Sequence, residues 1–112
     1  MLSKEYRLKK RSDFNLVFKK GRSVSNRFLE IRFKSLEEKK IAFVAPVSNF
    51  KKAATRNKIK RRLRESFREI IDDVKNETGI IVIAKKPIED KNLKETEEII
   101  KNLLVKAKLL RK

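Results

Sequence analysis

The sequence contains no cysteine and no histidine among its 112 residues, and only two glycines and two prolines. Without cysteine there can be neither a disulfide nor a thiolate metal site, which is typical of a reducing cytosol. Without histidine the chain lacks the commonest general base near neutral pH and the commonest metal ligand. No apolar run approaches the roughly 18–20 residues that span a bilayer, and residues 1–20 lack the apolar centre of a signal peptide. We therefore expect a cytoplasmic protein.

Positive charge is what the chain has in excess, with a formal net charge of +17. Residues 1–64 hold 21 Lys and Arg against 5 Asp and Glu, whereas residues 65–112 hold 11 against 10. This uneven distribution predicts that one part of the protein faces a polyanion. Nucleic acid is the first candidate. An anionic membrane surface is the second, and it is disfavoured because no basic amphipathic helix with exposed Trp or Phe is evident.

Apolar periodicity predicts one compact α+β domain over residues 1–112, in the order α-β-β-α-β-α. The basic residues 1–11 are expected to form an extended arm. A short helix is expected over 13–20, with Ser12 as its N-cap and Gly21 just after its end. Alternating side chains then predict strands over 27–33 and 41–47, joined as a hairpin, with Pro46 at the end of the second strand.

The second half is expected to contain a helix, a buried strand and another helix. The helix over 55–75 begins with Thr55 as its N-cap and keeps one apolar stripe along its length. The strand over 80–85 follows a turn at 78–79 and ends before Pro87, and the last helix starts near Asn92. Strand, helix and buried strand together predict a βαβ unit with a parallel pair.

The helix over 55–75 presents a row of polar side chains opposite its apolar stripe. The row consists of Asn57, Arg61, Arg64 and Arg68, and Lys58 and Arg62 lie on the neighbouring flank. Arginine suits phosphate because its planar fork donates two parallel hydrogen bonds and stays charged. Between positions 56 and 64 there are six Lys and Arg and no acidic residue. Neighbouring positive charges on a helix repel one another, and the helix dipole makes cations unfavourable at the N-terminus. This pattern therefore favours a polyanion-binding face over a merely solvated one.

Two aromatic residues, Phe14 and Phe18, lie four apart on the first helix. They fit either a core role or a surface on which RNA bases stack, since Lys19 and Arg27 are close by in sequence. The strand face that carries Arg32 would lie beside them if the helix packs on the hairpin.

Known nucleic-acid modules fit poorly. A KH domain needs a GxxG loop, and an RRM has a different order of elements. A general RNA-packaging protein and a sequence-specific DNA binder remain alternatives to a binder of structured or single-stranded RNA. Hydrolysis by the protein alone would need a base and clustered carboxylates. The acidic pair at 72–73 ends one predicted helix and the pair at 89–90 opens the next. Both are interpreted as structural, so we expect no catalytic residue in the protein.

The segment "RNKIKRRLRE", residues 56–65, resembles the signature helix of the bacterial ribonuclease P protein subunit. The resemblance extends to "RLKKRSDFNLVFKKGRSVSN" near the N-terminus and to "GIIVIAKKP" at residues 79–87. It implies a small mixed sheet with a left-handed βαβ crossover, an exception to the usual hand, as in a domain of ribosomal protein S5. It also implies the protein subunit of a ribonucleoprotein endonuclease that removes the 5′ leader of precursor tRNA.

The same resemblance implies the cofactor and the partners. Magnesium would be held mainly by the RNA subunit, and the protein would assist without being active alone. The expected partners are ribonuclease P RNA and precursor tRNA, with neither a membrane nor DNA.

The resemblance implies most of the site residues. Arg62 and Arg68 are added from their position on the helix, and Lys19 and Arg27 from their nearness in sequence to the two aromatic residues. The candidates for RNA binding on the signature helix are Arg56, Asn57, Lys58, Lys60, Arg61, Arg62, Arg64 and Arg68. The candidates for the leader-binding cleft are Phe14, Phe18, Arg32, Lys19 and Arg27. The sequence departs from the family pattern with lysine at 51 and 58, Arg32 in place of an aromatic, and Pro46 in a strand. No metal ligand is assigned in the protein.

Overall fold

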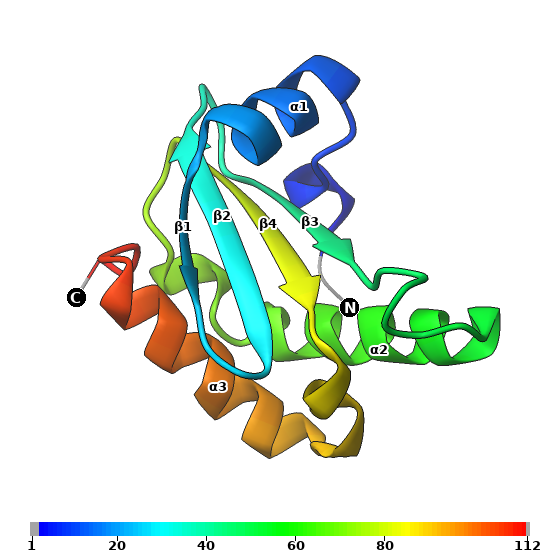
Figure 1. The fold of residues 1–112 in the computed structure, drawn as a ribbon. Helices are drawn as coiled ribbons and strands as arrows, with labels where there is room; N and C mark the ends of the chain where they lie inside the picture. Colours follow the sequence, from blue (N-terminus) through cyan, green and yellow to red (C-terminus); the bar gives the residue numbers. More distant parts are fainter. Residues whose placement is uncertain (1–2, 112) are drawn as a thin grey trace.

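A four-stranded mixed sheet lies between helices on its two faces in the computed structural model, which describes residues 3–111 (Figure 1). The strands are β1 (Arg22–Ser25), β2 (Leu29–Ser35), β3 (Lys40–Val44) and β4 (Thr78–Ala84), arranged across the sheet as β1-β2-β4-β3. β2 pairs antiparallel with both β1 and β4, and β3 pairs parallel with β4.

Three α-helices cover the sheet. α1 (Arg11–Lys20) packs against β2 and β4, while α2 (Ala53–Arg68) and α3 (Leu93–Lys106) pack on each other across the opposite face. Short 3-10 turns are η1 (Lys4–Tyr6), η2 (Ile71–Asp73) and η3 (Lys86–Asp90). The chain passes from β3 through α2 to the neighbouring parallel β4, and in Figure 1 this crossover has the expected left hand. Over residues 3–111, none of the helices has the length and apolar character needed to cross a membrane.

Alternating side chains of the sheet feed two apolar clusters. Ile80 and Val82 of β4 join the larger cluster with Leu63 and Phe67 of α2. Ile81, between them, faces the other way and packs with Val17 of α1. β4 lies between β2 and β3, and helices cover both faces of the sheet at this strand. It is therefore buried on both faces.

The predicted βαβ unit with a parallel strand pair is confirmed, but the predicted hairpin is wrong. β2 and β3 are not paired, since β4 lies between them. The hairpin is formed instead by β1 and β2, and β1 was not predicted because its short polar sequence shows no apolar alternation. The side chain of Asn26 closes this hairpin by accepting hydrogen bonds from the backbone N–H groups of Phe28 (2.8 Å) and Leu29 (2.9 Å).

Several predicted boundaries need correction. α1 begins at Arg11, so Ser12 lies inside the helix and does not cap it. α2 begins at Ala53, with Lys52 at the N-cap position that was predicted for Thr55, and it ends at Arg68. The apolar residues that follow Arg68 are nevertheless buried, because the chain continues into η2, where Ile71 packs in the larger apolar cluster.

The turn predicted at 78–79 is wrong, because both residues belong to β4. A Cβ added to Gly79 would lie 2.3 Å from a Leu36 methyl and 2.9 Å from Val17, so only glycine lets the loop after β2 and α1 approach the strand this closely. The last helix is confirmed: Asn92 caps α3 in a reciprocal capping box with Glu95.

The N-terminal arm is only partly extended. The turn η1 interrupts it, and Arg7 then forms a parallel bridge with Ile41 of β3. Leu8 is 7% exposed and packs with the α1 cluster. The arm is therefore part of the folded domain from Ser3 onward, and residues 1–2 of the predicted arm lie outside the described part of the chain.

Candidate nucleic-acid interface

One side of α2 carries polar side chains with unused hydrogen-bond donors. These residues are Asn57, Lys58, Lys60, Arg61 and Arg64. Asn57, Lys58 and Arg61 are exposed, and Lys60 and Arg64 are half-buried. None of the five side chains forms a hydrogen bond or an ion pair with another residue in the range 3–111. We refer to these five residues as the donor row.

The donor row is fixed in place by the opposite side of the helix. Ile59, Leu63 and Phe67 are at most 2% exposed in the main core. Because the helix is anchored along its length, the donors are held on a rigid surface instead of a mobile arm. A helix that is already folded loses little backbone entropy when its side chains bind a phosphate backbone.

Three other arginines of the helix are engaged within the protein. Arg56 Nη1 donates to the carbonyl oxygens of Phe50 and Lys51, each at 2.9 Å, and so holds the loop before α2. Arg68 pairs with Glu65 (3.7 Å) and Glu69 (3.5 Å). Backbone carbonyls bind Arg56 and Arg62, and such acceptors leave no signal in the sequence, whereas the partners of Arg68 are carboxylates. The assignment of these three arginines to an RNA contact stays a prediction.

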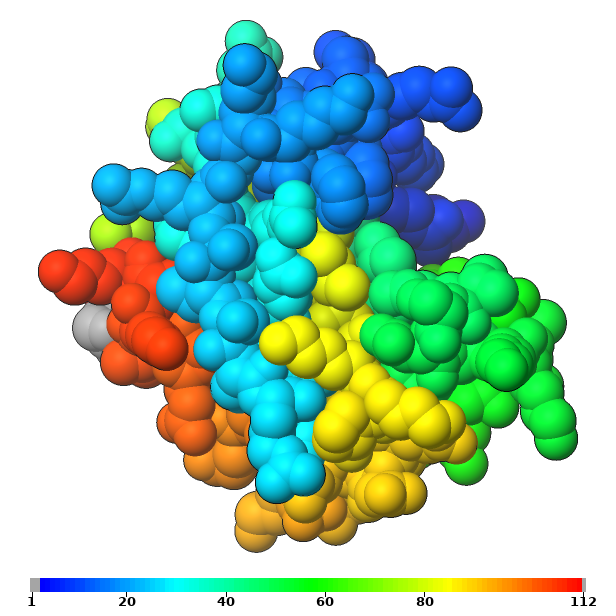
Figure 2. Space-filling view, viewed as in Figure 1, coloured from blue at the N-terminus to red at the C-terminus, as the bar shows by residue number. Residues whose placement is uncertain are grey.

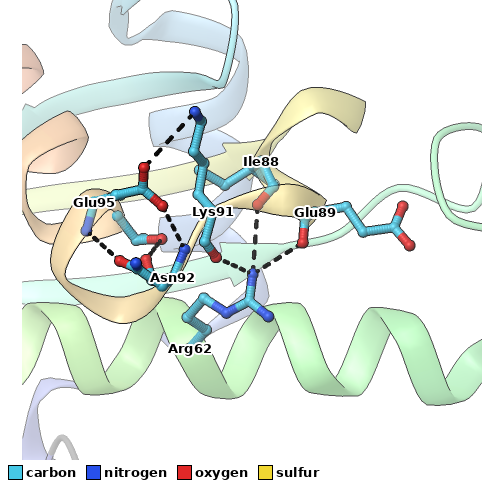
Figure 3. A network of polar contacts seen from close by, with 7 residues as sticks. Arg62, Ile88, Glu89, Lys91, Asn92 and Glu95 are labelled. Carbon is cyan, nitrogen blue, oxygen red and sulfur yellow. Dashed lines mark hydrogen bonds and ion pairs between the residues drawn. The ribbon is translucent and has the colours of Figure 1, made fainter.

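Arg62 makes the most extensive of these contacts (Figure 3). Its Nη1 donates to the carbonyl oxygen of Lys91 at 2.6 Å and, at longer range, to those of Glu89 (3.2 Å) and Ile88 (3.4 Å). These carbonyls belong to η3 and its C-terminal end. Arg62 thus joins α2 to the segment that links β4 and α3.

The loop before α2 is ordered despite the lysine at position 51 and Pro46. The carbonyl oxygen of Pro46 accepts from the N–H groups of Asn49 (3.0 Å) and Phe50 (2.9 Å). Phe50 is 2% exposed, and the Asn49 amide donates to the carbonyl of Ala84 at 3.2 Å. β3 ends at Val44, so Pro46 lies two residues after the strand, which was predicted to run to residue 47.

A hollow of about 200 Å³ extends from the donor row to the N-terminal segment. Arg64 lines it from α2 and Arg7 from the arm, above the β3 residues Ile41 and Phe43. The basic surface of the helix is therefore continuous with the N-terminal segment. This continuity was not predicted, because residues so far apart in sequence give no local signal.

The aromatic residues of α1 form a compact group with β2. The rings of Phe14 and Phe18 are stacked, with centroids 5.9 Å apart and planes 11° apart. Arg32 places its guanidinium carbon 4.4 Å from the centroid of Phe18 and donates from Nη1 to the Phe18 carbonyl at 2.6 Å. Its Nε donates to Glu30 at 2.8 Å.

The two rings of this group differ in role. Phe14 packs against the α1-side core, whereas Phe18 remains 37% exposed. Phe18 and the Arg32 guanidinium therefore form a flat aromatic and cationic surface at the edge of α1, the kind of surface on which a nucleic-acid base can stack.

The other two predicted cleft residues lie apart from this group. Lys19 is exposed on α1, and none of the interactions described for residues 3–111 connects it to Phe18 or Arg32. Arg27 lies at the turn between β1 and β2, where its guanidinium carbon is 5.4 Å from the ring centroid of Phe28. The structure thus joins Phe14, Phe18 and Arg32 and places Arg27 at the opposite end of β2.

The acidic residues considered for catalysis have structural surroundings. The carbonyl groups of Asp72 and Asp73 accept hydrogen bonds from Arg111, and these two residues form part of η2. Close by, burial lowers the pKa of Lys39, the charge of Arg111 lowers it further, and Asp72 and Asp73 oppose the shift. Among the described residues, no three acidic side chains gather as a metal site would require.

Comparison with known proteins gives one consistent result. The family model for ribonuclease P matches residues 2–108. The ribonuclease P protein component of Oceanobacillus iheyensis is 38% identical over 98% of this chain and 93% of that protein. That of Staphylococcus carnosus is 37% identical over 99% of this chain and 97% of its own length.

Solved structures agree with these sequence matches. The ribonuclease P protein of Staphylococcus aureus superposes with a TM-score of 0.80 at 32% identity, covering 100% of this chain and 97% of that one. The protein from Thermotoga maritima gives a TM-score of 0.78 at 30% identity, covering 89% of this chain and 96% of that one.

Proposed function

The chain belongs to the ribonuclease P protein family, and from that premise we propose that it binds a catalytic RNA and the 5′ leader of precursor tRNA. In this role the protein assists the endonucleolytic cut that produces the mature 5′ end of tRNA. The donor row on α2 supports the proposal most strongly. Its five polar side chains stand on a helix that is anchored in the core, and they bind no other residue in the range 3–111.

The donor row is the proposed contact to the RNA subunit. Arg61 and Arg64 donate to phosphate oxygens, and Lys58 and Lys60 add point charges on either side. Asn57 is the one uncharged member, and its amide can bind a phosphate, a 2′-hydroxyl or a base edge. Most of the affinity then comes from phosphate contacts and depends steeply on salt.

The group around Phe18 is the proposed contact to the leader. A single-stranded leader offers unpaired bases, which stack on aromatic rings and on guanidinium planes. Phe18 supplies the exposed ring, Arg32 supplies the guanidinium, and Phe14 supports Phe18 from the core side.

Cleavage itself is assigned to the RNA subunit with its bound magnesium. Magnesium would activate the attacking water and stabilise charge on the phosphate. Two features of the chain support this division: it has no histidine, and its described acidic residues do not form a ligand cluster. The protein contributes by holding leader and RNA subunit in register and by neutralising phosphate charge.

Reconstitution tests the proposal directly. The protein is mixed with ribonuclease P RNA and a precursor tRNA at a magnesium concentration at which the RNA alone is slow. We expect faster cleavage at the 5′ junction when the protein is present. No gain in cleavage, together with tight binding to unrelated structured RNA, would identify a general RNA-packaging protein instead.

A further inference from the structure

The end of the sheet remote from α1 carries another cation–aromatic cluster, in which two cations lie on one ring. Arg27 lies 5.4 Å and Lys91 Nζ 5.1 Å from the ring centroid of the half-buried Phe28. We propose that Arg27, Phe28 and Lys91 form a second contact surface for single-stranded RNA, held in position by Arg62. This proposal rests on the proposed function and extends it to a part of the molecule outside both the donor row and the Phe18 group.

The charges of this cluster are the first argument. Two like charges on one ring repel each other, and this repulsion is relieved when an anion binds between or beside them. Within residues 3–111, the Arg27 guanidinium has no hydrogen-bond acceptor from the protein. Lys91 has only a long contact of 4.0 Å to Glu95. Both cations therefore retain donors for phosphate, and the exposed face of the Arg27 guanidinium offers a plane for base stacking.

Rigidity is the second argument. The turn that carries Arg27 is fixed by Asn26, whose side chain binds two backbone N–H groups. Lys85 Nζ donates to the Asn26 carbonyl at 2.8 Å and ties the turn to the end of β4. The backbone N–H of Lys85 also donates to the Phe28 carbonyl at 3.0 Å. The segment is therefore ordered before any RNA binds, which lowers the entropic cost of binding.

Arg62 fixes the other half of the cluster. Its Nη1 donates to the Lys91 carbonyl at 2.6 Å, the shortest of its three contacts (Figure 3). Arg62 therefore sets the backbone from which the Lys91 side chain extends to Phe28. Arg62 belongs to the basic sequence of α2, but this contact directs it to η3. It acts in our proposal as a positioning residue.

The cluster and the Phe18 group are placed so that one RNA strand can reach both. Phe28 directly precedes β2 and Arg32 lies within it, so the two are four residues apart, about 13 Å in an extended chain. In the space-filling view the β1–β2 turn and the segment after β4 lie side by side at the lower edge of the face that carries α1 at its top (Figure 2). A strand that leaves the Phe18 group along β2 meets the cluster at the turn.

Salt-dependent binding to a short single-stranded oligoribonucleotide of mixed sequence tests the cluster. Arg27→Gln and Lys91→Gln should each reduce the slope of log affinity against log salt by about 0.7, the value for one phosphate contact on a single strand. Each should leave the melting temperature close to that of the wild type. Lys101→Gln removes an exposed charge on α3 and serves as the control, with an unchanged slope. Unchanged slopes for Arg27→Gln and Lys91→Gln would mean that the cations only cover Phe28, and the proposal would be wrong.

A double-mutant cycle tests the role of Arg62. Alone, Arg62→Gln should lower both the melting temperature and the slope. In the Lys91→Gln background it should still lower the melting temperature but should leave RNA binding unchanged, because the side chain that it positions is gone. A further loss of about 0.7 in slope would show that Arg62 itself contacts phosphate and would overturn the positioning role. These binding assays need no RNA subunit, so their failure is distinct from a failure to stimulate cleavage.

Discussion

Arg61 and Arg62 are neighbours in sequence but differ in their surroundings. Arg61 is exposed and has no partner in the described chain, whereas Arg62 is bound to three carbonyl groups of η3 and its end. Since successive helical residues are rotated by about 100°, one faces solvent and the other faces the β4–α3 connection. One run of basic residues can thus contain both the proposed RNA-binding surface and the contacts that hold the helix in place.

The largest effect is expected where the donor row loses two charges. Arg61→Gln combined with Arg64→Gln removes two charge-assisted contacts worth about 1.5–3 kcal/mol each. Affinity for ribonuclease P RNA should fall by about a hundredfold or more, while the melting temperature stays close to that of the wild type because neither side chain has a described protein partner. Filter binding and thermal unfolding of the same samples measure both quantities. Normal affinity would remove the donor row from the RNA interface.

A smaller and more selective effect is expected at the α1 surface. Phe18→Ala removes a stacking partner worth about 1–3 kcal/mol per base. Binding of precursor tRNA by the reconstituted enzyme should weaken by about tenfold, and binding of mature tRNA, which lacks the leader, should not change. Leu16→Ala, at another exposed apolar position of α1, is the matched control. Equal loss for both RNAs would return Phe18 to a purely structural role.

Arg56 should show the opposite profile to the donor row. Arg56→Gln removes the donor that holds the Phe50 and Lys51 carbonyls, so we expect a loss of about 1–2 kcal/mol in the free energy of unfolding. The melting temperature should fall by about 5 °C, as measured by circular dichroism. Full stability together with a lost RNA contact would show that Arg56 belongs to the donor row.

The smallest effect is expected at the cap of α3. Asn92→Ala removes the capping box with Glu95 and should cost about 1 kcal/mol of stability. RNA binding should not change, because the contact from Arg62 to the nearby Lys91 uses a backbone carbonyl that this substitution leaves in place. A clear loss of RNA affinity would indicate that the start of α3 itself contacts RNA.

The sequence predicted the parts of the fold that depend on local periodicity. The apolar stripe of α2 and the buried run of β4 were visible because their side chains repeat at helical and strand spacing. The neighbours of β4 could not be predicted in this way. Its insertion between β2 and β3 is set by the burial of both of its faces, a property of the whole sheet.

The candidate site residues fall into the same two groups, those with a local signal in the sequence and those without one. Charge and helical spacing alone marked Arg61 and Arg64 as candidates. Spacing placed Phe14 and Phe18 on one face of the first helix but left open whether they belong to the core or to a stacking surface. The inward turn of Arg56 and Arg62 could not be predicted, because their acceptors are backbone carbonyls without a residue-specific signal. Arg27 was assigned to the aromatic surface from its sequence neighbourhood, but β1 carries the chain away from α1 before Arg27 is reached.

Salt dependence of binding to ribonuclease P RNA is the most direct test of the donor row as the RNA surface. Wild-type protein, Arg61→Gln and Arg56→Gln are compared under identical conditions. We expect Arg61→Gln to lose about one unit of slope, as one phosphate contact would, and Arg56→Gln to keep the wild-type slope despite its lower stability. Equal slopes for all three proteins, or a loss in Arg56→Gln alone, would contradict the account.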